Sequence, residues 1–310
     1  MVNMNPAHSS GWGTNRRMGG VKIYLNGKLV DKDKAVISVF DHGLLYGDGV
    51  FEGIRSYNSL VFKLKEHIDR LYRSAEAIEL KIPMTKADMI KAVLETLKAN
   101  GLKDAYIRLV VTRGPGDLGL DPRKCKVPTV FIITDKISLY PKEFYQNGLA
   151  IITAKTRRNL TTALNPKIKS LNYLNNILAK IDAIKAGTEE AIMLTYNDYV
   201  AECTGDNIFI ISGGRLVTPP TDVGALEGIT RDAVIVLAVK MGIGFEEKMI
   251  RIEDIYAASE VFLTGTAAEI IPVTMIDKRR INGGKPGEVT KRLMEEFKKT
   301  TKVNGVKYEL

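Results

Sequence analysis

The segment that decides the fold runs from Asn165 to Lys180 and reads NPKIKSLNYLNNILAK. Pro166 disfavours a helix up to that point, because its ring removes a backbone donor. Apolar residues then recur at helical spacing until Gly187, namely Leu171, Leu174, Ile177, Leu178, Ile181 and Ile184. The pattern predicts a helix with Lys169 at its entrance, where the positive end of the helix dipole favours a neutral amine. Such a lysine suits Schiff-base chemistry, and a solvated surface lysine is the alternative.

The composition is that of an ordinary globular protein with a basic surface. The 310 residues, 45% of them hydrophobic, are enough for a large core in one large or two medium domains. The formal charge is +9, but Lys and Arg are dispersed among Glu. The densest basic places, Arg157-Arg158 and Lys278-Arg279-Arg280, are too short for a nucleic-acid tract and are interpreted as solvated surface. A positive field still favours an anionic cofactor and carboxylate substrates.

Several classes of site and location are disfavoured by what the sequence lacks. Cys125 and Cys203 have neither metal-ligand spacing nor a disulfide framework, so no metal site is predicted and a reducing cytoplasm fits. No apolar run reaches the roughly 18 residues that span a bilayer, and the polar start lacks a signal-peptide core. Residues 1–20 show no periodicity and are expected to form a disordered extension outside the fold.

Hairpins and helices mix without regular alternation, which predicts the α+β class rather than a doubly wound parallel sheet. The periodicity breaks at residues 135–148, which are interpreted as an interdomain linker between a small domain at 21–134 and a larger one at 149–310. Strands are predicted at 21–25, 29–30, 35–40, 106–112, 129–134, 149–154, 191–196, 199–204, 207–211, 215–218 and 259–264, and helices at 66–82, 85–100, 230–241 and 291–299, besides the one after Lys169.

The stretch from Gly114 to Gly119 matches the dinucleotide-binding pattern G-x-G-x-x-G and follows a strand. Pro122 prevents the helix that a dinucleotide site requires, so a mobile loop is predicted instead. No zinc-spaced cluster, P-loop or G-x-S-x-G motif is present. The three histidines, His8, His42 and His67, have no partner at the spacing of a catalytic triad or a metal site.

The residues from Ile168 to Tyr173 resemble the lysine segment of the fold-type IV pyridoxal-phosphate enzymes, the branched-chain aminotransferase group. The resemblance implies that Lys169 forms a Schiff base with pyridoxal 5′-phosphate and that Tyr173 bonds the cofactor O3′. Three residues separate the lysine from the tyrosine, whereas many branched-chain enzymes have four. Six motifs match in family order between about residues 21 and 281.

Two further segments resemble parts of the family's cofactor site. Residues 200–209, VAECTGDNIF, imply that Glu202 bonds the pyridine nitrogen, with an outward edge carboxylate as the alternative. An inward Glu202 needs a cationic partner, and a protonated pyridine is one. Residues 226–231, LEGITR, run into an apolar helix, and a glycine before a helix N-terminus is typical of a phosphate-binding site. The resemblance assigns Leu226, Gly228, Ile229 and Thr230 to cofactor binding, with a plain threonine cap as the alternative.

The remaining motifs concern the phosphate and the substrate. Residues 66–71, EHIDRL, imply Arg70 rather than Arg73 as the charged phosphate ligand, since the arginine fork binds phosphate bidentately. Residues 264–269, TGTAAE, imply that Thr266 helps hold the phosphate and that the Thr266 and Ala267 amides receive the substrate α-carboxylate. A plain strand-ending turn is the alternative.

Residues 46–55, YGDGVFEGIR, resemble the substrate-pocket strand of the branched-chain enzymes. The resemblance implies a pocket lined by Tyr46, Phe51, Gly53, Arg55, Tyr106 and Arg108. Core aromatics and surface arginines are the alternative for these residues.

The resemblance as a whole implies a two-domain fold-type IV enzyme with a small N-terminal α/β domain and a larger C-terminal pseudo-barrel domain. Its expected reaction moves the amino group of leucine, isoleucine or valine to 2-oxoglutarate, with Lys169 carrying the proton between Cα and C4′. Arg108 is the candidate for the distal carboxylate of glutamate. A D-amino-acid aminotransferase and an aminodeoxychorismate lyase are the alternatives within the family, and a basic RNA-binding protein is a remote one.

The expected partners are small amino acids and 2-oxo acids, with no nucleic acid and no membrane. The expected assembly is a homo-oligomer in the cytoplasm, a dimer or larger.

Overall fold

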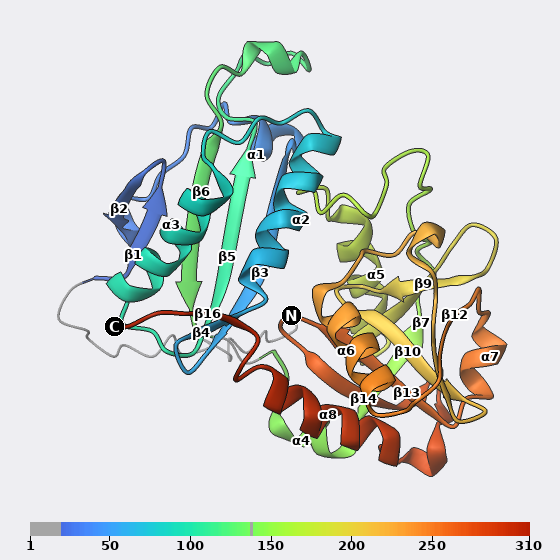
Figure 1. Cartoon of the computed structure of the whole chain (residues 1–310). Coiled ribbons are helices and arrows are strands. Elements are labelled where there is room, and N and C mark those ends of the chain that lie inside the picture. Colours follow the sequence, from blue (N-terminus) through green and yellow to red (C-terminus); the bar gives the residue numbers. More distant parts are fainter. Residues whose placement is uncertain (1–19, 137–138) are drawn as a thin grey trace, which may run out of the picture.

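The computed structural model describes residues 20–136 and 139–310 and arranges them in two lobes, each built on one sheet (Figure 1). The predicted extension at residues 1–20 therefore lies, except for Gly20, outside the described residues. Among the described residues, no helix is long and apolar enough to cross a membrane.

The first lobe contains an antiparallel sheet in the order β16-β4-β3-β5-β6-β1-β2. Its strands are β1 (Lys22–Leu25), β2 (Lys28–Asp31), β3 (Gly49–Tyr57), β4 (Leu60–Phe62), β5 (Ala105–Thr112), β6 (Thr129–Asp135) and β16 (Gly305–Lys307). Three helices accompany them, the short α1 (His42–Tyr46) and the longer α2 (Leu64–Ala77) and α3 (Lys86–Ala99). The last strand, β16, pairs with β4, so the end of the chain lies with the first lobe.

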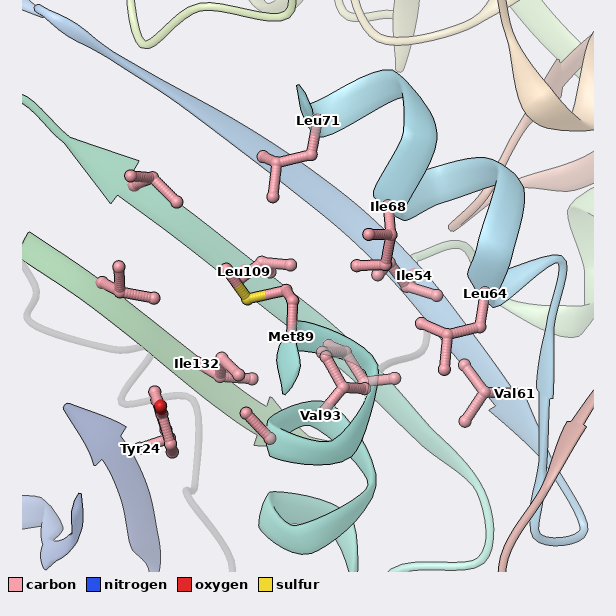
Figure 2. Close-up of a cluster of buried hydrophobic side chains, with 14 of the residues drawn as sticks. Tyr24, Ile54, Val61, Leu64, Ile68, Leu71, Met89, Val93, Leu109 and Ile132 are labelled. Atoms are coloured by element: carbon pink, nitrogen blue, oxygen red, sulfur yellow. The ribbon is translucent and has the colours of Figure 1, made fainter. Parts of the chain in front are cut away.

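A continuous apolar core fills the space between this sheet and the two longer helices (Figure 2). Leu64, Ile68 and Leu71 recur every three to four residues on α2, so they share one helix face. That face packs against residues of the central strands such as Ile54 and Leu109. The predicted amphipathic pattern of this helix is therefore what attaches it to β3 and β5.

The second lobe contains a mixed sheet in the order β12-β11-β10-β13-β14-β7-β8-β9, with β15 paired to β14. Its strands are β7 (Leu149–Thr153), β8 (Glu190–Leu194), β9 (Val200–Cys203), β10 (Asn207–Ser212), β11 (Arg215–Thr218), β12 (Phe245–Glu247), β13 (Glu260–Gly265), β14 (Glu269–Ile276) and β15 (Arg279–Arg280). The helices are α4 (Lys142–Asn147), α5 (Leu174–Lys185), α6 (Ile229–Lys240), α7 (Ile252–Tyr256) and α8 (Glu288–Thr300). Short 3₁₀ helices lie at Lys32–Lys34, Pro122–Lys124, Thr221–Val223 and Asn282–Gly284.

Backbone bonds curl this second sheet towards a barrel. β9 pairs with β8 in the sheet, and it also forms backbone bonds with residues outside that pair. The Cys203 N–H donates to the Asp206 carbonyl, and the Val200 N–H donates to the Ile250 carbonyl. The predicted α+β class is confirmed. The linker predicted at 135–148 contains α4, and the division into domains at 21–134 and 149–310 stays a prediction.

The strand predicted at residues 35–40 is wrong. A 3₁₀ helix at Lys32–Lys34 turns the chain after β2, and the next backbone bonds are local, from Ala35 to Lys32 and from Val36 to Lys34. Without a partner strand, this apolar segment stays exposed, with Val36 74% accessible. A short apolar run in the sequence can predict a strand but does not supply the strand edge with which it must pair.

The helix predicted at 66–82 ends early, because α2 stops at Ala77 and Glu79 adopts a left-handed φ of 52°. Ile82 still packs on the same core from the extended chain that follows. The spacing of apolar residues alone cannot distinguish the last turn of a helix from a non-helical segment that packs on the same core.

The helix after Lys169 begins only at Leu174, five residues downstream, so Lys169 does not stand at a helix entrance. The dipole argument fails for this reason, because the field of a helix terminus falls off within its first turn. The apolar stripe that predicted the helix also faces outward. Leu174 is 66% accessible and Ile184 63%, while the inward face of α5 is made of Asn176, Ala179 and Ala183.

Candidate active site

A cavity of about 540 Å³ lies between the two lobes. One wall comes from β3, β5 and α2, and the other from the segment before α5, the start of α6 and the turn after β13. Most of the predicted site residues line it: Phe51, Gly53, Arg70, Tyr106, Arg108, Lys169, Tyr173, Leu226, Gly228, Ile229, Thr230, Thr266 and Ala267. Motifs spread over more than two hundred residues of sequence therefore converge on one chamber.

Lys169 is held in the cavity wall by bonds to β3 and to α2, not by a helix that begins at the lysine itself. The Phe51 N–H donates to the Lys169 carbonyl at 3.0 Å, and the Lys169 N–H donates to Ser74 Oγ at 3.1 Å. Its Nζ donates to the Tyr173 hydroxyl at 3.1 Å and lies 4.7 Å from the centre of the Phe51 ring. The shorter spacing of lysine and tyrosine in this sequence therefore still brings the two groups into contact.

The N-terminus of α6 opens onto the same cavity. Gly228 is the N-cap and no side chain caps the helix, so the first N–H groups have no intrahelical partner. A Cβ at Gly228 would lie 2.0 Å from Asn207 Oδ1, which explains the glycine. Thr230 is the second helical residue and not the cap, contrary to the plain-cap alternative. An uncapped helix start that faces a cavity favours an anion.

Arg70 stands beside this helix start, fixed by a buried carboxylate. Its Nε and Nη2 donate to the two oxygens of Glu52 at 2.7 and 2.8 Å, and its Nη1 donates to the Glu227 carbonyl at 2.7 Å. These bonds use three of the five guanidinium N–H groups, which leaves two for a group in the cavity. Arg73, the rival on the same helix, is 58% accessible and does not line the cavity.

The same carboxylate also binds a histidine for which the sequence offered no partner. His67 Nδ1 lies 2.8 Å from Glu52 Oε2, and both side chains are almost fully buried. Burial raises the pKa of the Glu52 carboxyl, but Arg70 and then His67 outweigh it and hold that pKa below its usual value. Burial lowers the pKa of His67 more than Glu52 raises it. Arg70, which binds both oxygens of Glu52, is thus the main partner of this buried carboxylate.

Glu202 is buried behind the cavity wall and does not line it. Its Oε1 lies 2.6 Å from Arg158 Nη2, and its Oε2 accepts from the Leu226 N–H at 2.9 Å. The outward alternative for Glu202 is therefore wrong, and so is the solvated-surface interpretation of Arg158, which is 8% accessible. The paired arginine at 157 does lie on the surface, where it contacts Asp198. Adjacent basic residues in a sequence do not reveal that one points inward.

Two other predicted residues lie outside the cavity lining. The Tyr46 hydroxyl donates to the Leu118 carbonyl at 2.6 Å, on an exposed loop. Arg55 Nη1 donates to the Ala267 carbonyl at 3.1 Å and pairs with Glu269 at 2.9 Å. Arg55 therefore supports, from outside the cavity, the turn that is predicted to bind the substrate α-carboxylate. Contact of Tyr46 or Arg55 with the substrate stays a prediction.

Phe51, Tyr106 and Arg108 form a second polar region of the cavity. Arg108 Nη2 donates to the Tyr106 hydroxyl at 3.2 Å, and the Arg108 guanidinium lies 4.6 Å from the centre of the Phe51 ring. Because β3 and β5 pair with Gly53 opposite Arg108, these side chains rise from neighbouring positions of one sheet. The cavity thus holds one cation near the α6 start and another near Tyr106.

Several lining residues were not predicted from the sequence, among them Tyr140, Asn176, Lys180 and Asp206. Burial, followed by the charge of Glu190, raises the pKa of the Asp206 carboxyl. Asp206 stands in the segment that was singled out for Glu202, but no spacing rule distinguishes the two carboxylates. Tyr140 lies in the linker, where the lack of periodicity hid it.

The donor set fits a phosphate-bearing cofactor better than a metal. Thr264 Oγ1 lines the cavity, buried and without a partner among the described residues, beside the free N–H groups of α6 and Arg70. Within residues 20–136 and 139–310, no group of three or more His, Cys, Asp or Glu side chains could hold a metal ion. In the same part of the chain, no helix begins at the glycines of the 114–119 motif, as expected for a loop.

Residues 49–276 match the family model described as "Amino-transferase class IV", and the chain belongs to this family of enzymes. A "Putative branched-chain-amino-acid aminotransferase" of Methanocaldococcus jannaschii is 56% identical over 93% of this chain and 99% of its own.

Two solved structures, both of branched-chain aminotransferases, are similar to the whole fold. The enzyme from Thermoproteus uzoniensis with norvaline is 40% identical, with a TM-score of 0.86 over 92% of this chain and 96% of its own. The Escherichia coli enzyme is 34% identical, with a TM-score of 0.88 over 91% of this chain and 94% of its own. A further branched-chain aminotransferase, complexed with N-(5′-phosphopyridoxyl)-L-glutamate, is 36% identical, with a TM-score of 0.86 over 92% of this chain and 95% of its own.

Proposed function

We propose that this enzyme uses pyridoxal 5′-phosphate to move the amino group of branched-chain L-amino acids to 2-oxoglutarate. The observation that carries the proposal is the contact of Lys169 Nζ with the Tyr173 hydroxyl in a cavity that also receives the α6 N-terminus. The names of the relatives support branched-chain substrates, and the norvaline and phosphopyridoxyl-glutamate in two of the related structures support an aliphatic amino acid and glutamate as alternate ligands of such a site.

In the proposed binding site, different parts of the protein bind the phosphate, the ring hydroxyl and the ring nitrogen of the cofactor. The N–H groups at Ile229 and Thr230, with the two free N–H groups of Arg70, hold the phosphate. Tyr173 donates to the ring hydroxyl, and Glu202 keeps a proton on the ring nitrogen. When bound there, pyridoxal phosphate supplies an aromatic ring that accepts electrons from the substrate Cα.

Lys169 is the proposed catalytic residue. As a neutral amine it removes the proton from the substrate Cα and carries it to C4′ of the cofactor, so it acts as base and then as acid. The Tyr173 hydroxyl, 3.1 Å away, fixes the amine on the side of the cavity that faces Phe51. The amides of Thr266 and Ala267 hold the α-carboxylate, so that the Cα–H bond points at Lys169.

One chamber must accept both an aliphatic side chain and the carboxylate of glutamate in alternate half-reactions. Phe51 and Tyr106 provide apolar surface for the first, and Arg108 provides a cation for the second. The guanidinium packs on the Phe51 ring, so the same wall offers an aromatic face and a charge.

Arg108→Met is expected to raise the KM for glutamate and 2-oxoglutarate about ten- to a hundred-fold, because a charge-assisted bond contributes about 1.5–3 kcal/mol. The KM for leucine or isoleucine should change only a few-fold. Steady-state kinetics with both substrate classes measure the difference, and Arg123→Met, on an exposed loop, is the matched control. Equal losses for both classes would show that Arg108 is structural.

Gly53→Ala is expected to lower kcat/KM for all substrates by about 5- to 150-fold, the equivalent of about 1–3 kcal/mol of overpacking. The new Cβ would lie 2.2 Å from the Tyr106 hydroxyl, which must move and release its bond from Arg108. Gly244→Ala is the control, because its Cβ first meets Arg215 at 3.4 Å. Unchanged kinetics in Gly53→Ala would place the substrate elsewhere in the cavity.

Amino-donor profiling with both enantiomers tests the substrate class itself. The proposal expects L-leucine, L-isoleucine and L-valine to be donors and D-alanine to be inert. A preference for D-alanine would leave the cofactor site unchanged and assign the D-amino-acid alternative. Formation of pyruvate from aminodeoxychorismate, supplied without an amino acceptor, would indicate the lyase alternative.

A further inference from the structure

Arg158 has no role in the chemistry proposed above, although it pairs with the buried Glu202 next to the cofactor site. The Glu202 carboxylate and the Arg158 guanidinium are each about 6% accessible, and their closest atoms are 2.6 Å apart. Leu226 and Asn207, which both line the cavity, contact the same carboxylate through Oε2. The pair therefore stands directly behind the cavity wall.

Arg158 is fixed by more than this one contact. Its Nε donates to the Gly224 carbonyl at 3.0 Å, and its Nη1 donates to Asn176 Oδ1 at 2.9 Å. Asn176 lines the cavity from the first turn of α5, and Gly224 precedes the loop that carries Leu226. One planar guanidinium thus connects β9, α5 and that loop, and it presents Glu202 in a single orientation.

The charges around Glu202 act in opposite directions. Burial raises the pKa of the Glu202 carboxyl above its usual value, and the nearby Arg158 charge is the largest influence that opposes this rise. The Leu226 N–H, Lys169 and Arg70 also lower this pKa, more weakly. The carboxyl of Asp206, in the turn between β9 and β10, is a second acidic group close to Glu202. Loss of the Arg158 charge would therefore favour the neutral acid at position 202.

We propose that Arg158 is a positioning residue that keeps Glu202 charged, so that the proton shared between Glu202 and the cofactor ring nitrogen stays on the nitrogen. This inference rests on the proposed function. Only one proton is involved, and it lies either on the nitrogen beside a carboxylate or on the carboxyl beside a neutral nitrogen. Arg158 selects the first arrangement because it stabilises the negative charge on the carboxylate.

Arg158→Gln and Arg158→Lys form the test pair. Glutamine removes the charge and keeps a hydrogen-bond donor, while lysine keeps the charge and loses the planar fork. The control is Arg157→Gln, because Arg157 is the neighbouring residue in the sequence and is exposed. Each protein is reconstituted with pyridoxal phosphate labelled with ¹⁵N in the ring, and the ¹⁵N NMR shift reports whether that nitrogen is protonated.

The expected result is a protonated nitrogen in the unmodified enzyme, in Arg157→Gln and in Arg158→Lys. Arg158→Gln should move the ¹⁵N signal towards that of an unprotonated pyridine. Its kcat should fall about ten- to a hundred-fold, the range known for residues that orient a ligand group. The KM for leucine should change little, because Arg158 does not line the cavity.

Two results would overturn the inference. The first is an Arg158→Gln enzyme whose ring nitrogen stays protonated, which would make Arg158 a structural residue only. The second, which needs no variant and so holds even if Arg158→Gln does not fold, is an unprotonated ring nitrogen in the unmodified enzyme at neutral pH. Failure of the proposed function looks different. If the cofactor is wrong, the unmodified enzyme binds no labelled cofactor at all, and if the substrate class is wrong, the donor profile changes while the ¹⁵N signals of the variants keep the expected order.

Discussion

Lys169→Ala is expected to abolish transamination. Among the described residues that line the cavity, Lys169 is the one whose amine bonds the Tyr173 hydroxyl, so it is placed both to anchor the cofactor and to move the Cα proton. Lys180 also lines the cavity, but its amine donates to the Glu189 carbonyl. The measurement is the rate of 2-oxo acid formation from L-leucine, and activity near that of the unmodified enzyme would contradict the assignment.

Borohydride reduction followed by peptide mapping identifies the lysine directly. The pyridoxyl group is expected on Lys169. Lys167 is the rival in the sequence, but its amine binds Asp222 and Glu227 outside the cavity lining. Lys167→Ala is therefore the matched control, and it should keep both the cofactor and the activity. Label on Lys167 would move the catalytic role to that residue.

Arg70→Ala is expected to weaken cofactor affinity by about 2–5 kcal/mol, or about thirty- to several-thousand-fold in Kd, as when one partner of a buried charge pair is removed. The loss has two sources. The phosphate loses two donors, and Glu52 keeps a buried charge with only His67 beside it. Inorganic phosphate should then compete with the cofactor more easily in a titration.

Arg73→Ala is the control for Arg70, because it removes an arginine from the next turn of α2 without touching the cavity. The effect on folding is separated by a second variant, Arg70→Ala with Glu52→Gln, in which no unpaired carboxylate remains. This double variant should regain thermal stability but not cofactor affinity. An unchanged Kd in Arg70→Ala would move the phosphate to other donors.

The sequence predicted the local elements well where a period and a turn residue agreed. The helix from Thr85 to Asn100 is confirmed, and the Thr85 side chain accepts from the Asp88 N–H as a cap does. The hairpin at Asn26 and Gly27 is also confirmed. Each of these depends on contacts within a few residues, which a sequence displays directly.

Predictions that depended on a distant partner failed. The apolar segment 35–40 forms no strand, and the apolar stripe of α5 faces outward while Ala179 and Ala183 provide the inner face. Arg158 was interpreted as solvated, and His67 was left without a partner. In each case the outcome depends on residues far away in the sequence, and helical or strand periodicity cannot predict contacts at that separation.

The sequence by itself determined the α+β class, the family and thirteen of the residues that line one cavity. Each of these motifs is a short run of residues that can be identified without knowing what surrounds it in the fold. Only the tertiary structure decided how the charges are paired. Glu52 holds Arg70, Arg158 holds Glu202, and β3 together with Ser74 of α2 holds Lys169. Burial is the physical reason, since a charge that leaves water must find a partner in space, wherever that partner stands in the chain.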